Sequence, residues 1–123
     1  MNTVQDINFT PKVRRALEVA RQRCAENNQS EITDEFLLHA ILFSESMIVN
    51  MVFQSLSIEI KDVILTLSKV LPSNKKKISA SIIKYSSSIT KIINDSYNIS
   101  KSFNQNYTGI EHVFLSLLRH SDS

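Results

Sequence analysis

The feature that most constrains this chain is an internal repeat with a constant offset of 76 residues. Phe9-Thr10-Pro11 and Tyr85-Ser86-Ser87 each consist of an aromatic residue, a hydroxyl residue that can cap a helix, and a helix start. A glutamate follows 25 residues after that hydroxyl residue in both copies, as Glu35 and as Glu111. Since the offset holds across both segments without a gap, we predict two copies of one structural unit.

Both copies are predicted to be helical. The chain has one glycine and two prolines among 123 residues, fewer than sheets with tight hairpin turns require. Apolar residues recur at three- and four-residue spacing, and alternation with a period of two is not sustained. This spacing predicts helices over residues 11–26, 34–43, 47–56, 60–71, 87–103 and 110–119. We therefore expect one all-α domain of two tandem pseudo-symmetric repeats over 1–123, with repeat one over 9–72, a linker over 73–84 and a partial repeat two over 85–120.

Individual side chains are assigned to the core by their positions on these helices. Cys24 lies on the apolar stripe of the first helix, which favours a buried structural thiol over a reactive one. Met47 and Met51 are four residues apart and are expected in the core, with a Met-lined binding groove as the alternative. Phe103 is expected to face inward from the end of the fifth helix. On the sixth helix the residues expected to be buried are Val113, Phe114, Leu117 and Leu118.

Composition argues against several classes of partner. The net charge is +2, and Lys75-Lys76-Lys77 has no interleaved aromatic residues, so we expect a solvated linker and no nucleic-acid partner. One cysteine excludes an internal disulfide and favours a reducing compartment, the cytoplasm or a plastid stroma. No apolar stretch approaches the roughly 18 residues of a membrane span and no signal peptide is apparent, so no membrane partner is expected.

Catalytic constellations are also missing from the sequence. There is no Gly-x-x-x-x-Gly-Lys-Ser/Thr loop for a nucleotide and no assembly of nucleophile, base and orienting acid. His39, His112 and His120 lack the His-Glu-x-x-His spacing and have no companion cysteines. We therefore predict a protein that is not an enzyme and that uses no metal and no cofactor.

The repeat starts resemble a known family. Phe9-Thr10-Pro11 is similar to the aromatic-Thr-Pro opening of the repeat in the N-terminal domain of the Clp protein-unfolding ATPases. The second copy keeps Gly109, Glu111 and His112 of that family's Gly-Thr-Glu-His motif, which leucines follow. The resemblance covers residues 9–119. It implies a helical fold like that of a Clp N-domain and a role in binding proteins.

The chain departs from the family pattern at several positions. Thr33 and Asp34 stand where the family has Gly and Thr in repeat one, and Ile110 replaces Thr in repeat two. In the family two further helices follow the leucine-rich one, whereas this sequence ends soon after it, so the second repeat is expected to be truncated. Residues 113–118 are then expected to be less well covered than their counterparts, and self-association through them is a further expectation.

Glu35 and Glu111 are the candidate site residues. One interpretation is that each is an acid in a first helical turn, where the helix dipole stabilises it by about 0.3–1 kcal/mol. The other comes from the resemblance, because in Clp N-domains of the ClpC type the matching glutamates and helix-capping threonines form two pockets for phosphorylated arginine. The resemblance implies one pocket with Thr10 and Glu35 and a second with Ser86 and Glu111. Asp34 is expected to weaken the first pocket, because its negative charge lies where a phosphate would bind.

Three functional hypotheses follow. The first is a non-catalytic binding module that recruits substrates or adaptor proteins to a Clp unfoldase–protease. The second is a stand-alone Clp-repeat accessory or regulatory protein that binds the Clp protease assembly. The third is a helical interaction protein with only a fold-level resemblance to the family.

Overall fold

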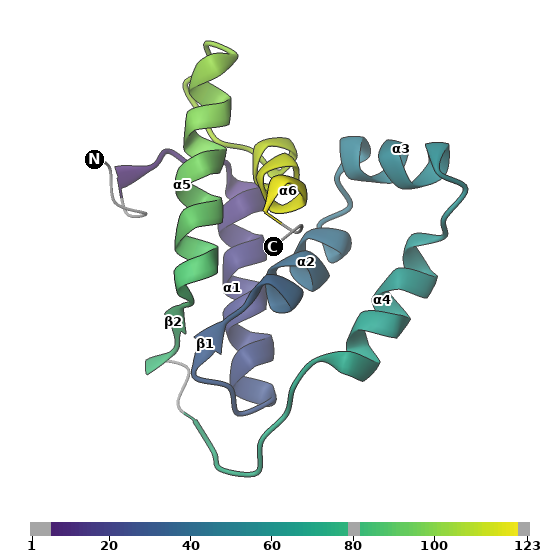
Figure 1. The fold of residues 1–123 in the computed structure, drawn as a ribbon, viewed down its shortest axis with the longest axis vertical. Coiled ribbons are helices and arrows are strands. Elements are labelled where there is room, and N and C mark those ends of the chain that lie inside the picture. The colour runs from purple at the N-terminus through teal and green to yellow at the C-terminus, as the bar shows by residue number, and fades with distance from the viewer. Residues whose placement is uncertain (1–5, 79–81, 121–123) are drawn as a thin grey trace.

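Helices dominate the computed structural model, which describes residues 6–78 and 82–120 (Figure 1). The elements in chain order are α1 (Pro11–Glu26), β1 (Glu31–Ile32), α2 (Asp34–Phe43), α3 (Met47–Ser55), α4 (Ile60–Val70), β2 (Lys84–Tyr85), α5 (Ser87–Ser102) and α6 (Ile110–Arg119). The six predicted helices are present, and their ends agree with the prediction to within one residue. The predicted all-α class is therefore confirmed.

The 76-residue offset is present in the backbone as well as in the sequence. α1 and α5 each have 16 residues, and α2 and α6 each have ten. The turn after each long helix is repeated too, since Asn28 and Asn104 have positive φ angles of 56° and 58°. The next residue, Gln29 or Gln105, then donates its backbone N–H to the carbonyl five residues earlier. The two repeats are thus pseudo-symmetric down to single turns.

Two short parallel pairings exchange partners between the repeats. β1 pairs with β2, which places Ile32 opposite Tyr85, and an isolated parallel bridge joins Phe9 to Thr108. Each pairing connects the residues before a 16-residue helix to the residues before the ten-residue helix of the other repeat. The sequence analysis missed these pairings, because two residues are too few to show alternation with a period of two.

The core lies where α2 and α6 pack together in the middle of the molecule (Figure 1). α1 packs against α2 and α5 packs against α6, which repeats the same helix pair in each half. The second helix was predicted to be apolar nearly all round and central, and its side chains at Phe36, Leu37 and Ile41 are fully buried. Cys24 is buried as predicted, and its thiol donates to the carbonyl of Glu31.

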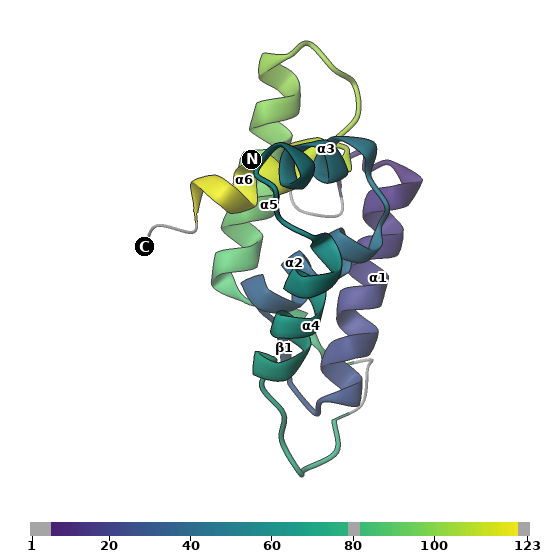
Figure 2. The same cartoon turned by 90° about the vertical axis from the view of Figure 1, so that its right-hand side faces the viewer.

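α3 and α4 form an arm that belongs to repeat one (Figures 1 and 2). α3 packs against α6, and α4 packs against α2. No residue of α4 is fully buried, and its half-buried side chains are Ile60, Val63, Ile64 and Leu67. Within the described residues, no single helix has the length and apolar composition to cross a bilayer, and α2 with α3 reaches them only as a pair bent by 100°.

Four of the predicted core positions are wrong, and one of them is Leu118, which is 48% exposed on α6. Met47 and Met51 are exposed, because α3 lies at the periphery and buries Val49 on the opposite side of the helix. Phe103 is also exposed, because it follows the last turn of α5, which extends beyond the neighbouring helices (Figure 1). Amphipathic spacing identifies the apolar side of a helix but not whether a neighbour covers it.

Candidate binding site at the start of α6

The four predicted site residues lie at the starts of four helices. Thr10 caps α1 and accepts from the backbone N–H of Val13 at 3.3 Å, and Ser86 caps α5 in the same way. Glu35 is in the first turn of α2 and Glu111 is in the first turn of α6. The two capping hydroxyls therefore act as predicted, and both glutamates lie where a helix dipole favours negative charge.

The structure pairs the starts of these helices between the repeats, whereas the predicted pockets group them within each repeat. The backbone N–H of Thr10 donates to the carbonyl of Thr108 at 3.1 Å, which brings the start of α1 to the start of α6. Likewise Ser86 donates to Ile32 at 3.1 Å, which brings the start of α5 to the start of α2. Thr10 is thus on the side of Glu111 rather than of Glu35. The exchanged parallel pairings cause this crosswise arrangement.

A chain of side-chain hydrogen bonds organises the start of α6. The backbone N–H of Gly109 donates to Nδ1 of His112 at 2.8 Å. Because a backbone N–H can only donate, the ring proton is on Nε2 of His112, which donates to Oε1 of Gln105. Nε2 of Gln105 in turn donates to the hydroxyl of Tyr107 at 3.0 Å. His112 is therefore a buried structural residue that positions Gln105 and Tyr107, which the sequence analysis did not identify.

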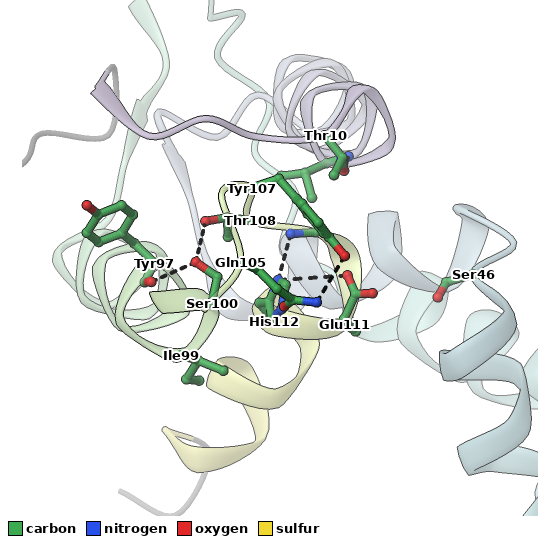
Figure 3. Close-up of polar contacts among 12 residues, drawn as sticks. Thr10, Ser46, Tyr97, Ile99, Ser100, Gln105, Tyr107, Thr108, Glu111 and His112 are labelled. Atoms are coloured by element: carbon green, nitrogen blue, oxygen red, sulfur yellow. Dashed lines mark hydrogen bonds and ion pairs between the residues drawn. The ribbon is translucent and has the colours of Figure 1, made fainter. Parts of the chain in front are cut away.

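Glu111 lies beside these hydrogen-bonded side chains, and its own side chain is 37% exposed (Figure 3). One carboxylate oxygen is 3.8 Å from Nδ1 of His112, but that nitrogen accepts from Gly109 and so carries no proton for an ion pair. A Cβ at position 109 would collide with the same carboxylate, so glycine is what allows Glu111 to fold back over the helix start. Among the described residues no lysine or arginine lies within ion-pair distance of Glu111.

The start of α2 has the same backbone but different contacts. Thr33 occupies the position of Gly109, and its hydroxyl is buried without a hydrogen-bond partner among the described residues. Asp34 accepts a hydrogen bond from the hydroxyl of Ser88 at 2.8 Å, in the first turn of α5. Glu35 is exposed to solvent. The carboxylate of Asp34 therefore already provides the negative charge that the dipole of α5 favours.

A groove of about 530 Å³ adjoins Glu111 between α3 and α6. Its apolar walls come from α3, α6 and the residue after α5, and consist of Ile48, Val52, Phe103, Phe114, Leu115 and Leu118. Gln105, Glu111 and His112 line the polar end. In repeat one, α4 packs against α2. The uncovered side of α6 was expected at residues 113–118, and within that range Leu115 and Leu118 are exposed while Val113, Phe114 and Leu117 are buried.

The titratable groups away from this groove provide no reactive centre. Burial raises the pKa of Cys24 to about 11, so its thiol stays protonated at neutral pH. Burial, with a smaller contribution from Arg23, lowers the pKa of His39. Within residues 6–78 and 82–120 no three His, Cys, Asp or Glu side chains are placed to hold a metal ion. What the geometry offers is a surface for binding: an apolar groove with a carboxylate at one end.

Comparison with known proteins agrees with this geometry. Residues 8–123 match the family of the Clp repeat (R) N-terminal domain. The chain belongs to this family. The resemblance seen at the repeat starts is therefore confirmed.

Solved Clp N-domains share the fold at low sequence identity. The N-domain of ClpV from Vibrio cholerae has a TM-score of 0.79 at 19% identity, over 97% of this chain and 70% of that one. The Hsp104 N-terminal domain from Candida albicans has a TM-score of 0.78 at 16% identity, over 92% and 75%. A complex of the ClpV N-domain with a VipB peptide has a TM-score of 0.76 at 19% identity, over 97% and 71%. No curated protein sequence matches this Clp N-domain.

Proposed function

We propose that this Clp N-domain recruits substrate polypeptides or adaptor proteins to a Clp unfoldase–protease. The observation that carries the proposal is the groove between α3 and α6, which combines exposed apolar walls with a single carboxylate at one end. Exposed apolar surface of this kind is typical of sites that bind other proteins. A peptide complex of the ClpV N-domain, which has the same fold, supports a peptide as the ligand.

Glu111 gives this site a preference for cationic side chains. A carboxylate pairs with a guanidinium group through two parallel hydrogen bonds, and Glu111 has no lysine or arginine partner within the described chain. The start of α1, which Thr10 caps, lies on the same side of the molecule, with Tyr107 between Thr10 and Glu111 in the view of Figure 3. Free amides at a helix start favour an anion. The combination favours arginine, and phosphorylated arginine in particular.

Binding of an unfolded polypeptide tests the proposal. A labelled, permanently unfolded polypeptide rich in apolar residues is titrated with the chain, and fluorescence anisotropy reports binding. Leu115→Glu places a charge in the groove and is expected to weaken binding by about tenfold or more. Leu65→Glu is the matched control, because Leu65 is also an exposed leucine, at 58% against 41% for Leu115, but lies on α4 outside the groove. The proposal fails if the unmodified chain does not bind, or if both variants bind as it does.

A further inference from the structure

A second groove, the α1 groove, has a volume of about 340 Å³ and lies between the starts of the two repeats. Its other walls are residues 7–9 and Tyr85, which come from the segments before α1 and before α5. One wall is a stripe of α1 that consists of Arg14, Leu17, Glu18 and Arg21. These positions have the spacing i, i+3, i+4 and i+7, so the four side chains share one side of the helix.

Main-chain carbonyl groups hold both arginines of the α1 groove in place. Nη2 of Arg14 donates to the carbonyl of Phe9 at 2.9 Å, and Nη1 of Arg21 donates to the carbonyl of Ile83. A guanidinium group has several N–H donors, so each arginine keeps donors for a ligand. Because these long side chains are already ordered, less conformational entropy is lost when a ligand binds them.

The chain neutralises only part of the positive charge in this groove. Nε of Arg21 is 4.0 Å from a carboxylate oxygen of Glu18, whose side chain is 60% exposed, and exposed pairs of this kind contribute little. Within the part of the chain that the structure describes, no carboxylate lies at ion-pair distance from Arg14. Residues 1–5, which precede the groove in the sequence, include no acidic residue. The complementary charge is therefore expected from a ligand.

The second repeat provides an internal comparison for this charge. The 76-residue offset carries Arg14 to Thr90 and Arg21 to Tyr97, on a helix of the same length. Neither of these residues carries a positive charge. The pair of anchored arginines is therefore a feature of α1 alone and does not follow from the repeated backbone.

We propose that the α1 groove binds an acidic segment of a partner protein. Two carboxylates of that segment pair with Arg14 and Arg21, which are two helical turns and so roughly 10 Å apart along α1. Leu17 lies between the arginines on the same stripe, and Phe9 and Tyr85 add apolar lining, which suits an apolar side chain between the two carboxylates. A nucleic-acid backbone has a continuous row of phosphates and no such side chain. This surface goes beyond the proposed function, because it is distinct from the groove at α6 and prefers the opposite charge.

A short labelled peptide of glutamate and leucine tests the proposal. It is titrated with the whole chain, and fluorescence anisotropy reports binding. Arg14→Gln combined with Arg21→Gln is expected to weaken binding by about tenfold or more. Lys12→Gln combined with Arg15→Gln is the matched control, because it removes the same charge from α1 outside the groove, and a change of about twofold at most is expected. Glu18→Gln removes the competing carboxylate and is expected to strengthen binding by about two- to fivefold.

The alternatives give different results, and each of them overturns the proposal. Equal losses in both double variants would mean that the peptide responds to net charge, and equal binding of a peptide with glutamine in place of glutamate would remove the carboxylates from the interaction. An oligothymidine that competes as strongly as the peptide would identify a general polyanion site. A dimer in sedimentation that Arg14→Gln with Arg21→Gln dissociates would identify a second copy of the chain as the occupant.

The two grooves are tested separately. Leu115→Glu changes the groove at α6 and is expected to leave binding of the acidic peptide unchanged, so a loss of about tenfold there would place the peptide at α6 and overturn the proposal. Binding of the unfolded polypeptide reports on the groove at α6. Its failure would therefore end the proposed recruitment through α6 without deciding what the α1 groove binds.

Discussion

The two repeats have the same backbone but use it for different purposes. At the start of α2, Asp34 binds Ser88 of the other repeat, and α4 covers the outer side of the helix. At the start of α6, Glu111 remains partly exposed and the corresponding outer side is open. Within the described residues, repeat one thus covers the outer side of its ten-residue helix and pairs Asp34 with the other repeat, whereas the outer side of α6 is exposed at Leu115 and Leu118.

Two residue differences account for most of the contrast at the helix starts. Gly109 leaves room for the Glu111 carboxylate, whereas Thr33 fills the equivalent position in repeat one. Ile110 and Asp34 occupy equivalent positions in the two repeats. Ile110 is buried, whereas the carboxylate of Asp34 lies at the start of α5. Repeat one therefore has an acidic side chain at the helix start where repeat two has a buried apolar one.

Truncation of equivalent leucines tests the difference in coverage most strongly. Leu42→Ala removes a buried side chain beneath α4 and is expected to lower the free energy of unfolding by about 2–5 kcal/mol. Leu118→Ala is expected to cost less than about 1 kcal/mol, because nearly half of that side chain is already exposed to water. Urea unfolding measures both. Equal losses would mean that the two leucines are equally covered, and would contradict the comparison.

The helix caps test how similar the two repeats are. Thr10→Ala and Ser86→Ala each remove a hydroxyl that accepts from a backbone N–H, and each is expected to lower the free energy of unfolding by about 0.5–2 kcal/mol. Ser87→Ala is the control, because Ser87 is exposed and follows the cap. Thermal unfolding of the three variants shows whether the losses are equal. If only one of the two cap variants lowers the free energy of unfolding, the caps of α1 and α5 do not contribute equally.

The sequence predicts the helices and the repeat well, because spacing and capping are local properties. It predicts less about how the repeats meet. The pairing of Thr10 with the side of Glu111 depends on two-residue parallel contacts between distant segments, which leave no pattern in the sequence. Gln105 and Tyr107 were missed for a related reason, since their role exists only through the tautomer of His112. The exposure of Met47 likewise depends on which helix packs beside α3.

His39 in repeat one and Leu115 in repeat two occupy equivalent positions. The histidine makes the stability of the fold depend on pH, whereas the leucine cannot. Burial lowers the pKa of His39 in the folded chain below its ordinary value of 6.5, and one ring nitrogen is buried without a partner among the described residues. The unfolded chain therefore binds a proton more readily, so this contribution to stability is complete above pH 6.5 and is lost as the pH falls below it.

His39→Leu is expected to remove this part of the pH dependence. It also replaces a buried polar group that is only half satisfied, so stability near pH 7 should change little. Urea unfolding at several pH values between 5 and 8 measures both effects. His120→Gln is a control with His39 intact, and it should leave the His39 contribution in place. A steep acid-side loss that survives His39→Leu would assign the effect to another group.

The smallest expected effect is weak binding of phosphoarginine, which the two helix starts should distinguish. Titration into isotopically labelled protein is expected to shift the amide signals of Gly109, Ile110 and Glu111, because that carboxylate has no lysine or arginine partner within the described chain. The signals at the start of α2 should move less, since Asp34 repels the phosphate. Asp34→Ala removes that charge and should increase the shifts there, while Glu111→Gln should reduce those at α6. Unchanged spectra at millimolar ligand would leave both glutamates as helix-dipole acids, and equal shifts at both starts would show that Asp34 does not close the first pocket.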